Sequence, residues 1–220
     1  MLATTLDALY LGQVHPMPGD GRPTAIFKQP VTTAVALGID GLAGDQQADR
    51  RVHGGPEKAV HHYPARDLAR LRARFADIAG QLQPGSMGEN FSTADWDEAD
   101  VCIGDVFRVG TAILQLSQPR SPCWKIDARH GVDGMAQFID HEGISGWYYR
   151  VVQPGSVRAG DRIELVERNA DPVSLQAFWA LRREQRPDHA ELRRVIDTPG
   201  LAPERRARLQ QRLEWLQRNT

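Results

Sequence analysis

The sequence predicts a mainly β protein of the α+β class, with a barrel-like β-domain containing short helices over residues 1–168 and a small three-helix domain over residues 169–220. Up to Arg168, short apolar runs are broken by Gly, Pro and Asp, the spacing typical of strands and turns. Two similar Gly-Asp turns, at 104–105 and 160–161, each begin an alternating run. Because the intervening segments are too short for repeated strand–helix–strand crossovers, we expect a mixed, mainly antiparallel barrel.

Eight runs in the first 168 residues are strand candidates. They span residues 8–15, 24–28, 33–37, 58–63, 106–109, 112–117, 146–152 and 162–166. Two short helices interrupt them. Pro64 occupies a favoured first-turn position, and apolar residues follow it at helical spacing from 68 to 78. The second helix is expected over 134–141.

Three helices are predicted in the tail after Asn169, separated by turn signals at 186–188 and 198–200. Pro203 favours the start of the last helix. The tail carries 10 Arg against seven acidic residues. A solvated Arg-rich face explains this excess most simply, and a dock for a partner protein or an anionic ligand is the alternative. No candidate site residue lies in the tail, so residues 1–168 alone are expected to hold the site.

Composition and charge exclude several classes of protein. The chain of 220 residues is 41% apolar and 25% charged, which is ordinary for a globular protein and unlike a disordered or collagen-like chain. A net charge of −1 provides no basic surplus for duplex nucleic acid. The sequence has neither an export signal nor a run of about 18 apolar residues, which predicts a cytoplasmic protein without membrane contact. Cys102 and Cys123 are then expected to be reduced thiols.

A loop rich in Gly and charged residues precedes the strand candidate at 58–63. It holds Asp49, His53, the pair Gly54-Gly55 and Lys58, one of only three lysines in the chain. The glycine pair allows backbone N–H groups to approach an anion, and the lysine adds a positive charge. A tight turn with solvated charges is the alternative.

A second glycine-spaced loop, at 85–91, offers Glu89 as an acceptor and Asn90 as an amide. An ordinary turn into a strand is the alternative, since Asn tolerates turn conformations. His61 and His62, on one strand candidate, must point to opposite faces, so at most one can join a site there. No His or Cys pair has the spacing of a zinc site, so a structural metal is not expected.

The strongest site signal lies in residues 117–125. Two prolines, three residues apart, hold this segment extended and leave Arg120 and Cys123 little freedom. Arg120 and Lys125 place positive charge near the thiol and favour the thiolate, the form that binds metals or attacks electrophiles. A lone Cys is more often a small buried hydrophobe, and Cys102 is expected to be one.

Short motifs occur in order along nearly the whole chain. They are Gly44-Asp45, Ala48-Asp49, His53-Gly54-Gly55, Lys58-Ala59-Val60, Gly88-Glu89-Asn90, Gly104-Asp105, Gln118-Pro119-Arg120, Pro122-Cys123 and Gly146-Trp147-Tyr148-Tyr149-Arg150. This set resembles the MOSC domain family, named for the C-terminal domain of molybdenum cofactor sulfurase. The resemblance is closest to the bacterial YiiM-type branch, whose members carry a helical tail called the 3-alpha domain.

The resemblance implies a barrel-like fold that binds a pyranopterin molybdenum cofactor, with Cys123 as the molybdenum ligand. It also implies detoxifying reduction of N-hydroxylated compounds, such as 6-hydroxylaminopurine, to amines, independently of pyridoxal phosphate. A thiolate suits the soft sulfur surroundings of molybdenum held by a pterin dithiolene. The sequence has no flavin, nicotinamide or iron–sulfur fingerprint, so electrons are expected from a separate reductase, a flavoprotein. Association with further copies of the chain stays open.

Roles for the cofactor-binding residues follow from motif position. Arg120 is expected to clamp the cofactor phosphate through its planar, two-pronged donor. Lys58 and the amides of Gly54 and Gly55 are expected to serve the same group or the pterin edge.

Further motif residues offer hydrogen bonds and proton transfer. Asn90 and His53 are expected to hydrogen-bond pterin or oxo groups. N–O cleavage needs two protons, and His53, Asp49 and Glu89, in that order, are the candidates for moving them.

Two other functions remain open. One is a persulfide or molybdenum-cofactor carrier that uses Cys123. The other is a Cys–His hydrolase in which Cys123 attacks and His53 or His62 acts as base. The hydrolase is the least favoured, because no oxyanion-hole signature or orienting residue for the histidine is apparent.

Overall fold

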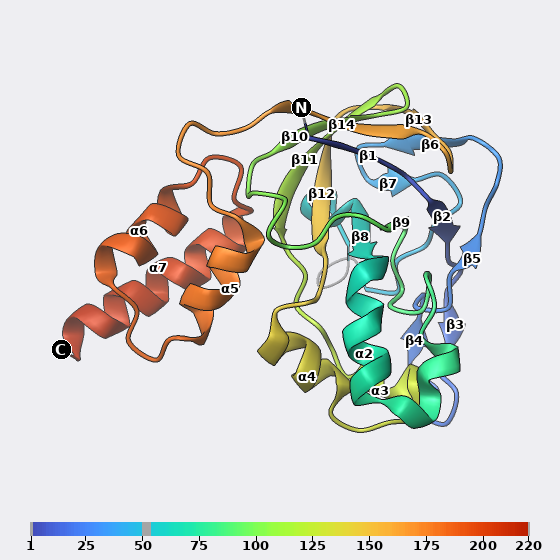
Figure 1. Ribbon diagram of the computed structural model, residues 1–220, viewed down its shortest axis with the longest axis horizontal. Coiled ribbons are helices and arrows are strands. Elements are labelled where there is room, and N and C mark those ends of the chain that lie inside the picture. The colour runs from blue at the N-terminus through green and yellow to red at the C-terminus, as the bar shows by residue number, and fades with distance from the viewer. Residues whose placement is uncertain (1, 50–53, 220) are drawn as a thin grey trace.

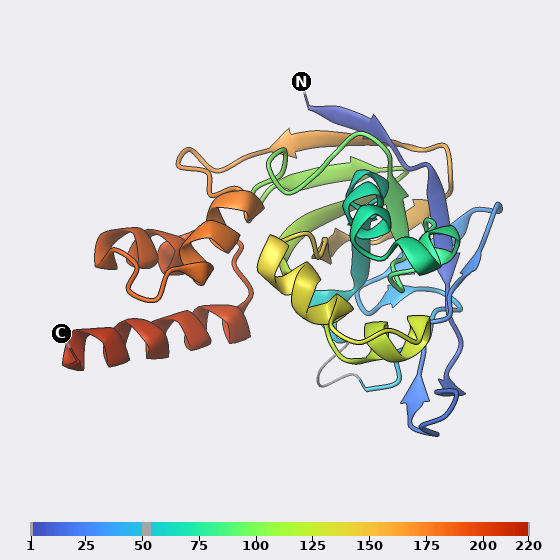
Figure 2. The same ribbon diagram turned by 60° about the horizontal axis from the view of Figure 1, so that its bottom comes forward.

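The computed structural model describes residues 2–49 and 54–219. A curved body built mainly of strands has short helices at one end, and a three-helix tail extends from its side (Figure 1). Figure 2 shows the strands wrapping around the interior of this body. The arrangement agrees with the mainly β, barrel-like fold class that the sequence predicts.

A nine-stranded sheet forms the body. Its strands, in order across the sheet, are β1 (Ala3–Thr5), β14 (Arg162–Glu167), β10 (Val106–Val109), β11 (Ala112–Pro119), β12 (Trp147–Gln153), β8 (Val60–Pro64), β9 (Phe91–Thr93), β2 (Ala8–Leu11) and β5 (Gln29–Pro30). All neighbours are antiparallel except β8 and β9, which are parallel. Side chains alternate as a half-buried strand requires: on β10, Phe107 and Val109 are buried and Arg108 is exposed. The mixed, mainly antiparallel arrangement is therefore confirmed.

The sheet is strongly curved, but within the described residues it does not close into a barrel, and β1 and β5 are its edge strands. The chain passes directly from β1 to β2 and ties distant strands together on the way. The N–H of Leu6 donates to the carbonyl of Asp161 at 2.8 Å, and the N–H of Asp7 donates to the carbonyl of Ser92 at 3.0 Å. These bonds bring the start of β14 close to β9 and give the barrel-like shape.

Two smaller sheets flank the body, one of β13 (Gly155–Val157), β6 (Val35–Gly38) and β7 (Gly41–Leu42), the other of β3 (His15–Pro16) and β4 (Pro23–Thr24). The strand predicted over 24–28 is wrong beyond Thr24. The N–H of Lys28 donates to the carbonyl of Ile26 at 3.0 Å, which turns the chain sharply, and the Ile26 side chain is buried against neighbouring helices. Long-range packing overrides the alternating pattern here.

Short helices cover one end of the body. The helical region predicted from Pro64 is divided into η2 (Ala65–Asp67), α2 (Leu68–Arg74) and η3 (Ala76–Gln81). The predicted helix at 134–141 is confirmed as α4 (Met135–Glu142), whereas α3 (Lys125–His130) was not predicted. The strand predicted from Lys58 begins two residues later, because Pro56 starts the short helix η1 (Pro56–Lys58).

The tail forms the three predicted helices, α5 (Leu175–Arg183), α6 (His189–Asp197) and α7 (Pro203–Arg218). The side chains of Ser174 and Asp188 cap the first two by accepting backbone N–H groups. Phe178 and Leu213 of the tail belong to the same buried cluster as Phe107 of the sheet. The domain boundary between 168 and 169 stays a prediction.

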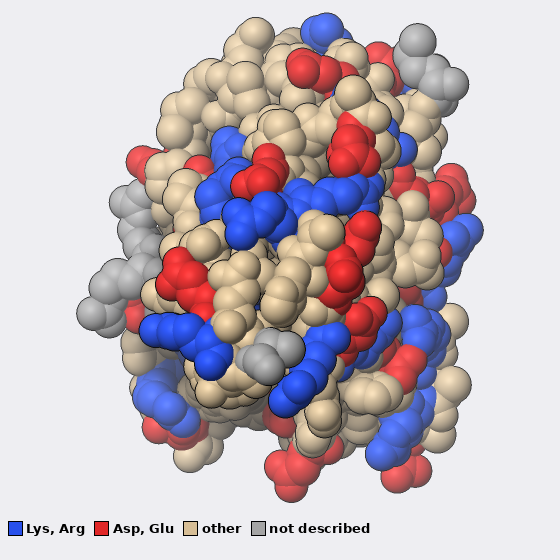
Figure 3. Space-filling model, turned by 90° about the vertical axis from the view of Figure 1, so that its left-hand side faces the viewer, with Lys and Arg blue, Asp and Glu red and all other residues tan. Residues whose placement is uncertain are grey.

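Three of the ten arginines of the tail, Arg182, Arg194 and Arg208, form ion pairs among the described residues. Basic and acidic side chains are interspersed on the face that the tail presents (Figure 3). The ion pairs include Arg182–Asp140 at 2.7 Å, Arg194–Asp171 at 2.7 Å and Arg208–Glu204 at 2.6 Å. This pattern favours the solvated-face interpretation of the basic excess. None of the helices within 2–49 and 54–219 is long and apolar enough to span a membrane.

His62 of β8 provides a test of the core. Its Nδ1 lies 3.1 Å from the Tyr149 hydroxyl and its Nε2 lies 2.9 Å from Thr93 Oγ1, and burial lowers the pKa of His62 to about 3. The unfolded chain binds a proton near pH 6.5 and the folded chain does not, so stability is lost as the pH falls below about 6.5.

We expect His62→Gln to have a lower free energy of unfolding than the unmodified protein at pH 7. This gap between the two proteins should narrow by about 2 kcal/mol by pH 5, because only the unmodified protein loses stability through His62. Chemical denaturation at several pH values measures this gap, and a constant gap would contradict the burial of a neutral His62.

Candidate functional site

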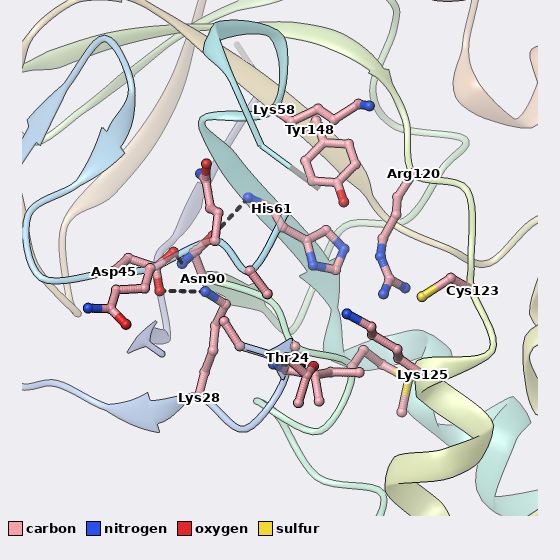
Figure 4. A pocket seen from close by; sticks show the side chains of 17 residues that line it. Thr24, Lys28, Asp45, Lys58, His61, Asn90, Arg120, Cys123, Lys125 and Tyr148 are labelled. Carbon is pink, nitrogen blue, oxygen red and sulfur yellow. Dashed lines mark hydrogen bonds and ion pairs between the residues drawn. The ribbon is translucent and has the colours of Figure 1, made fainter. Parts of the chain in front are cut away.

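A cavity opens where β8, β11 and β12 meet the segments 24–28 and 45–48. It encloses about 600 Å³, a volume that includes the solvent space at its open mouth. Two groups of side chains define it (Figure 4). We call them the thiol end, with His61, Arg120, Cys123 and Tyr148, and the aspartate end, with Lys28, Asp45 and Asn90.

Positive charge gathers in this cavity. All three lysines of the chain, Lys28, Lys58 and Lys125, line it together with Arg120. Among the described residues that line the cavity, only Asp45 is acidic. The excess of cations in a confined space favours an anionic ligand.

The structure holds the backbone of Arg120 in place at the end of β11. Its N–H donates to the carbonyl of Gly146 at 3.0 Å, and its own carbonyl accepts from the hydroxyl of Ser145 at 2.6 Å. The side chain is only 6% exposed, and its Nη1 has no hydrogen-bond partner among the described residues. A buried guanidinium N–H without an acceptor is costly, and Arg120 lines the cavity, so this atom is a candidate donor to a ligand there.

His61 and Tyr148 complete the thiol end, with ring centroids 5.3 Å apart. Burial and the neighbouring charge of Arg120 hold the pKa of His61 well below its usual value, so the imidazole is neutral. Its Nε2 is buried without a partner among the described residues. Burial raises the pKa of Tyr148 although Arg120 opposes the effect, so the phenol keeps its proton. As predicted, His61 and His62 face opposite ways, and only His61 reaches the cavity.

Cys123 is a half-buried free thiol of the cavity wall. The residues that follow it are anchored to the β3–β4 hairpin: the guanidinium of Arg22 stacks 3.8 Å from the Trp124 ring centroid, and Lys125 donates to the carbonyl of Pro23 at 2.7 Å. These contacts add to the two prolines in fixing the thiol. The other thiol, Cys102, is buried outside the cavity lining, and burial raises its pKa.

The aspartate end is a hydrogen-bonded network. Asp45 accepts from Lys28 Nζ at 2.5 Å, from the Gly12 N–H at 2.6 Å and from Asn90 Nδ2 at 3.0 Å. Burial lowers the pKa of Lys28, and Asp45 opposes that effect. Asn90 also accepts from the backbone N–H of His61 at 3.1 Å, so its amide orients the wall of the cavity. Asn90 lines the cavity, and its polar atoms are engaged by the protein, so its predicted bond to a pterin or oxo group stays a prediction.

The other predicted site residues are distributed unevenly. Lys58 lines the cavity, whereas Gly54, Gly55, Asp49 and Glu89 are not among its lining residues. Glu89 is fully buried, and its carboxylate accepts the backbone N–H of Gly85 and of Met87 within its own turn. His53 lies outside the described residues.

Sequence reasoning assigned no binding or proton-transfer role to four residues that line the cavity, which are Lys28, Asp45, His61 and Tyr148. Lys125 was expected only as a positive charge near the thiol. The scarcity of lysine was the available signal, because every lysine of the chain proves to line the cavity. The partner of each of these residues lies far away in sequence, and composition carries no information on such pairing.

The fold and the site define a known class of protein. The model of the MOSC domain family matches residues 49–164, more than half of the chain. The chain therefore belongs to the MOSC domain family, as its motifs predict.

Individual relatives place the chain in the YiiM-type branch of that family. Protein YiiM of Escherichia coli (strain K12) is 37% identical over 194 residues, which are 88% of this chain and 86% of that protein. The crystal structure of YiiM from Geobacillus stearothermophilus matches with a TM-score of 0.80 at 29% identity, over 96% of this chain and 99% of that one. A Gibberella moniliformis protein named "Reductase" is 34% identical over 146 residues, 66% of this chain and 26% of that protein.

The unpartnered donor of Arg120 leads to a prediction for the full chain without added cofactor. Inorganic phosphate bound at Arg120 is expected to slow alkylation of Cys123 by iodoacetamide. Arg120→Ala should abolish this protection and Arg120→Lys should keep part of it, because a single ammonium replaces a planar two-pronged donor. Peptide mass spectrometry measures the rate, with Arg108→Ala on the exposed face of β10 as the control. Equal protection in all four proteins would remove Arg120 from the anion site.

Proposed function

We propose that this chain is a MOSC-family oxidoreductase that holds the molybdenum cofactor in the cavity, with Cys123 as the molybdenum ligand. Its proposed reaction is the reduction of N-hydroxylated compounds, such as 6-hydroxylaminopurine, to amines. The observation that carries the proposal is the thiol end, where a half-buried thiol shares a basic cavity with a buried guanidinium that lacks an acceptor. The relative named "Reductase" supports the oxidoreductase class.

The residues of the cavity fit such a cofactor. Arg120 would hold its phosphate, and Lys58 would add positive charge. The unpartnered Nε2 of His61 would meet a polar atom of the pterin. The described residues contain no group of three His, Cys, Asp or Glu side chains able to hold a metal, so a metal at Cys123 would need further ligands from the cofactor. The soft thiolate suits molybdenum whose other ligands are sulfur.

Reduction of an N–OH group to an amine consumes two electrons and two protons and releases water. The cofactor, when bound, supplies the two-electron chemistry. Tyr148 keeps its proton and can donate a hydrogen bond to the departing oxygen at the thiol end, while the neutral His61 can accept or pass on a proton. Among the earlier proton-transfer candidates, Glu89 and Asp49 do not line the cavity, so Tyr148 and His61 take precedence.

The electrons would come from a separate reductase, which we propose to be a flavoprotein. The chain carries no flavin or nicotinamide fingerprint of its own. The substrate would be a small molecule, because the thiol end of the cavity is formed mainly by buried side chains, those of His61, Arg120 and Tyr148.

The two cysteines provide the test of this proposal. Cys123→Ser should abolish reduction of 6-hydroxylaminopurine by the cofactor-loaded protein and leave the fold intact, because a hard hydroxyl replaces a soft thiolate. Cys102→Ala should keep turnover and lose about 1 kcal/mol of stability. Chromatography of the product measures turnover with a supplied electron donor. Full turnover by Cys123→Ser, or its loss in Cys102→Ala alone, would overturn the assignment and favour a carrier function.

A further inference from the structure

The last helix of the tail contacts the wall of the cavity, although no described residue of the tail lines it. The N–H of Ala202, just before α7, donates to the carbonyl of Ser117 at 2.9 Å. In the first turn of α7, Nη2 of Arg205 donates to the carbonyl of Pro119 at 3.2 Å and to the hydroxyl of Ser121 at 2.9 Å. These acceptors lie on either side of the site arginine, in the segment that continues to the thiol. Arg205 therefore bridges the part of the wall that carries the thiol end.

The position of Arg205 is unfavourable for a charged group without such acceptors. Burial, together with the neighbouring charges of Arg182 and Arg208, lowers the pKa of Arg205 to about 10. The guanidinium stays charged at neutral pH and packs 6.0 Å from the ring centroid of Phe178. The carbonyl and hydroxyl of the wall accept hydrogen bonds from Arg205 and offset the cost of burying its charge. The position therefore requires a side chain that donates hydrogen bonds.

A second contact joins the same helical turn to the cavity. Glu204 lies 3.5 Å from Nζ of Lys58, which lines the cavity and is 13% exposed. The carbonyl of Glu57, one residue earlier, accepts the hydroxyl of Ser117 at 2.6 Å. The first turn of α7 thus meets both η1, which carries Lys58, and the end of β11, which Arg120 follows; both cations are labelled in Figure 4.

We propose that Arg205 is a positioning residue of the cavity and that α7 fixes the segment carrying Arg120 and Cys123. The helical tail is then part of the site, which revises the sequence-based expectation that residues 1–168 alone suffice. This inference concerns the wall of the cavity and holds whichever group the cavity binds.

The test compares Arg205→Met, Arg205→Lys and the unmodified full chain, all without added cofactor. Alkylation of Cys123 by iodoacetamide reports its access, and the buried Cys102 serves as the internal reference. Loss of Arg205 should release the segment, so alkylation should quicken about fivefold, the effect of losing one typical hydrogen bond. The phosphate concentration needed for half-protection should rise about as much, and Arg205→Lys should restore part of both.

Arg206 is the matched control. It is the next residue of α7, is also half-buried and also donates to two acceptors, but these are the carbonyls of Ile196 and Thr198 within the tail. Arg206→Met should lower the melting temperature and leave the alkylation rate and the phosphate protection of Cys123 unchanged.

Two results would overturn the proposal. One is an unchanged alkylation rate of Cys123 in folded Arg205→Met. The other is an equally large change of that rate in Arg206→Met. If Arg205→Met does not fold, Ser121→Ala decides, because it removes one acceptor of Arg205 at an exposed position. Alkylation faster than in the unmodified protein supports the role of Arg205, and an unchanged rate rejects it. Since no assay involves turnover, these outcomes are independent of whether the cavity holds molybdenum.

Discussion

The close approach of Gly146 to β8 is the contact on which the cavity depends. Gly146 has a φ of +69°, and a Cβ there would lie 2.1 Å from the carbonyl oxygen of His62, so a side chain cannot be accommodated. Its N–H donates to Glu98 at 2.9 Å, and its carbonyl accepts from the N–H of Arg120 at 3.0 Å. Burial and the nearby carboxyl of Asp67 raise the pKa of Glu98 well above its usual value, so the buried pair retains a proton. This single junction joins β8, β11 and β12.

The junction explains how polar groups can be held unpaired. The backbones of Arg120 and His61 are fixed by bonds to Gly146 and Asn90, and one nitrogen of each side chain, Nη1 of Arg120 and Nε2 of His61, is left buried without a partner among the described residues. Their desolvation cost is met by the stability of the surrounding core. A ligand that accepts from Arg120 and meets His61 would recover part of that cost. The site is thus organised before the ligand arrives.

Local signals predicted the elements whose shape is decided nearby. The strand 106–109 has the predicted bounds, since its turn and its alternating pattern are both local. The prolines around Arg120 likewise marked a site segment. The segment 24–28 departs from its pattern because Ile26 packs against distant helices and Lys28 pairs with Asp45 in a distant loop. Sequence could not show that the carboxylate of Glu89 is engaged by amides of its own turn, or that the start of α7 meets β11.

Counting the ligands of bound molybdenum shows whether the Cys123 sulfur is one of them. X-ray absorption at the molybdenum edge counts the sulfur neighbours of the metal in the cofactor-loaded protein. We expect molybdenum in Cys123→Ser, loaded in the same way, to lose one sulfur neighbour relative to the unmodified protein, while Cys102→Ala keeps the same number. An unchanged sulfur count in Cys123→Ser with molybdenum bound would show that Cys123 is not a ligand of the metal.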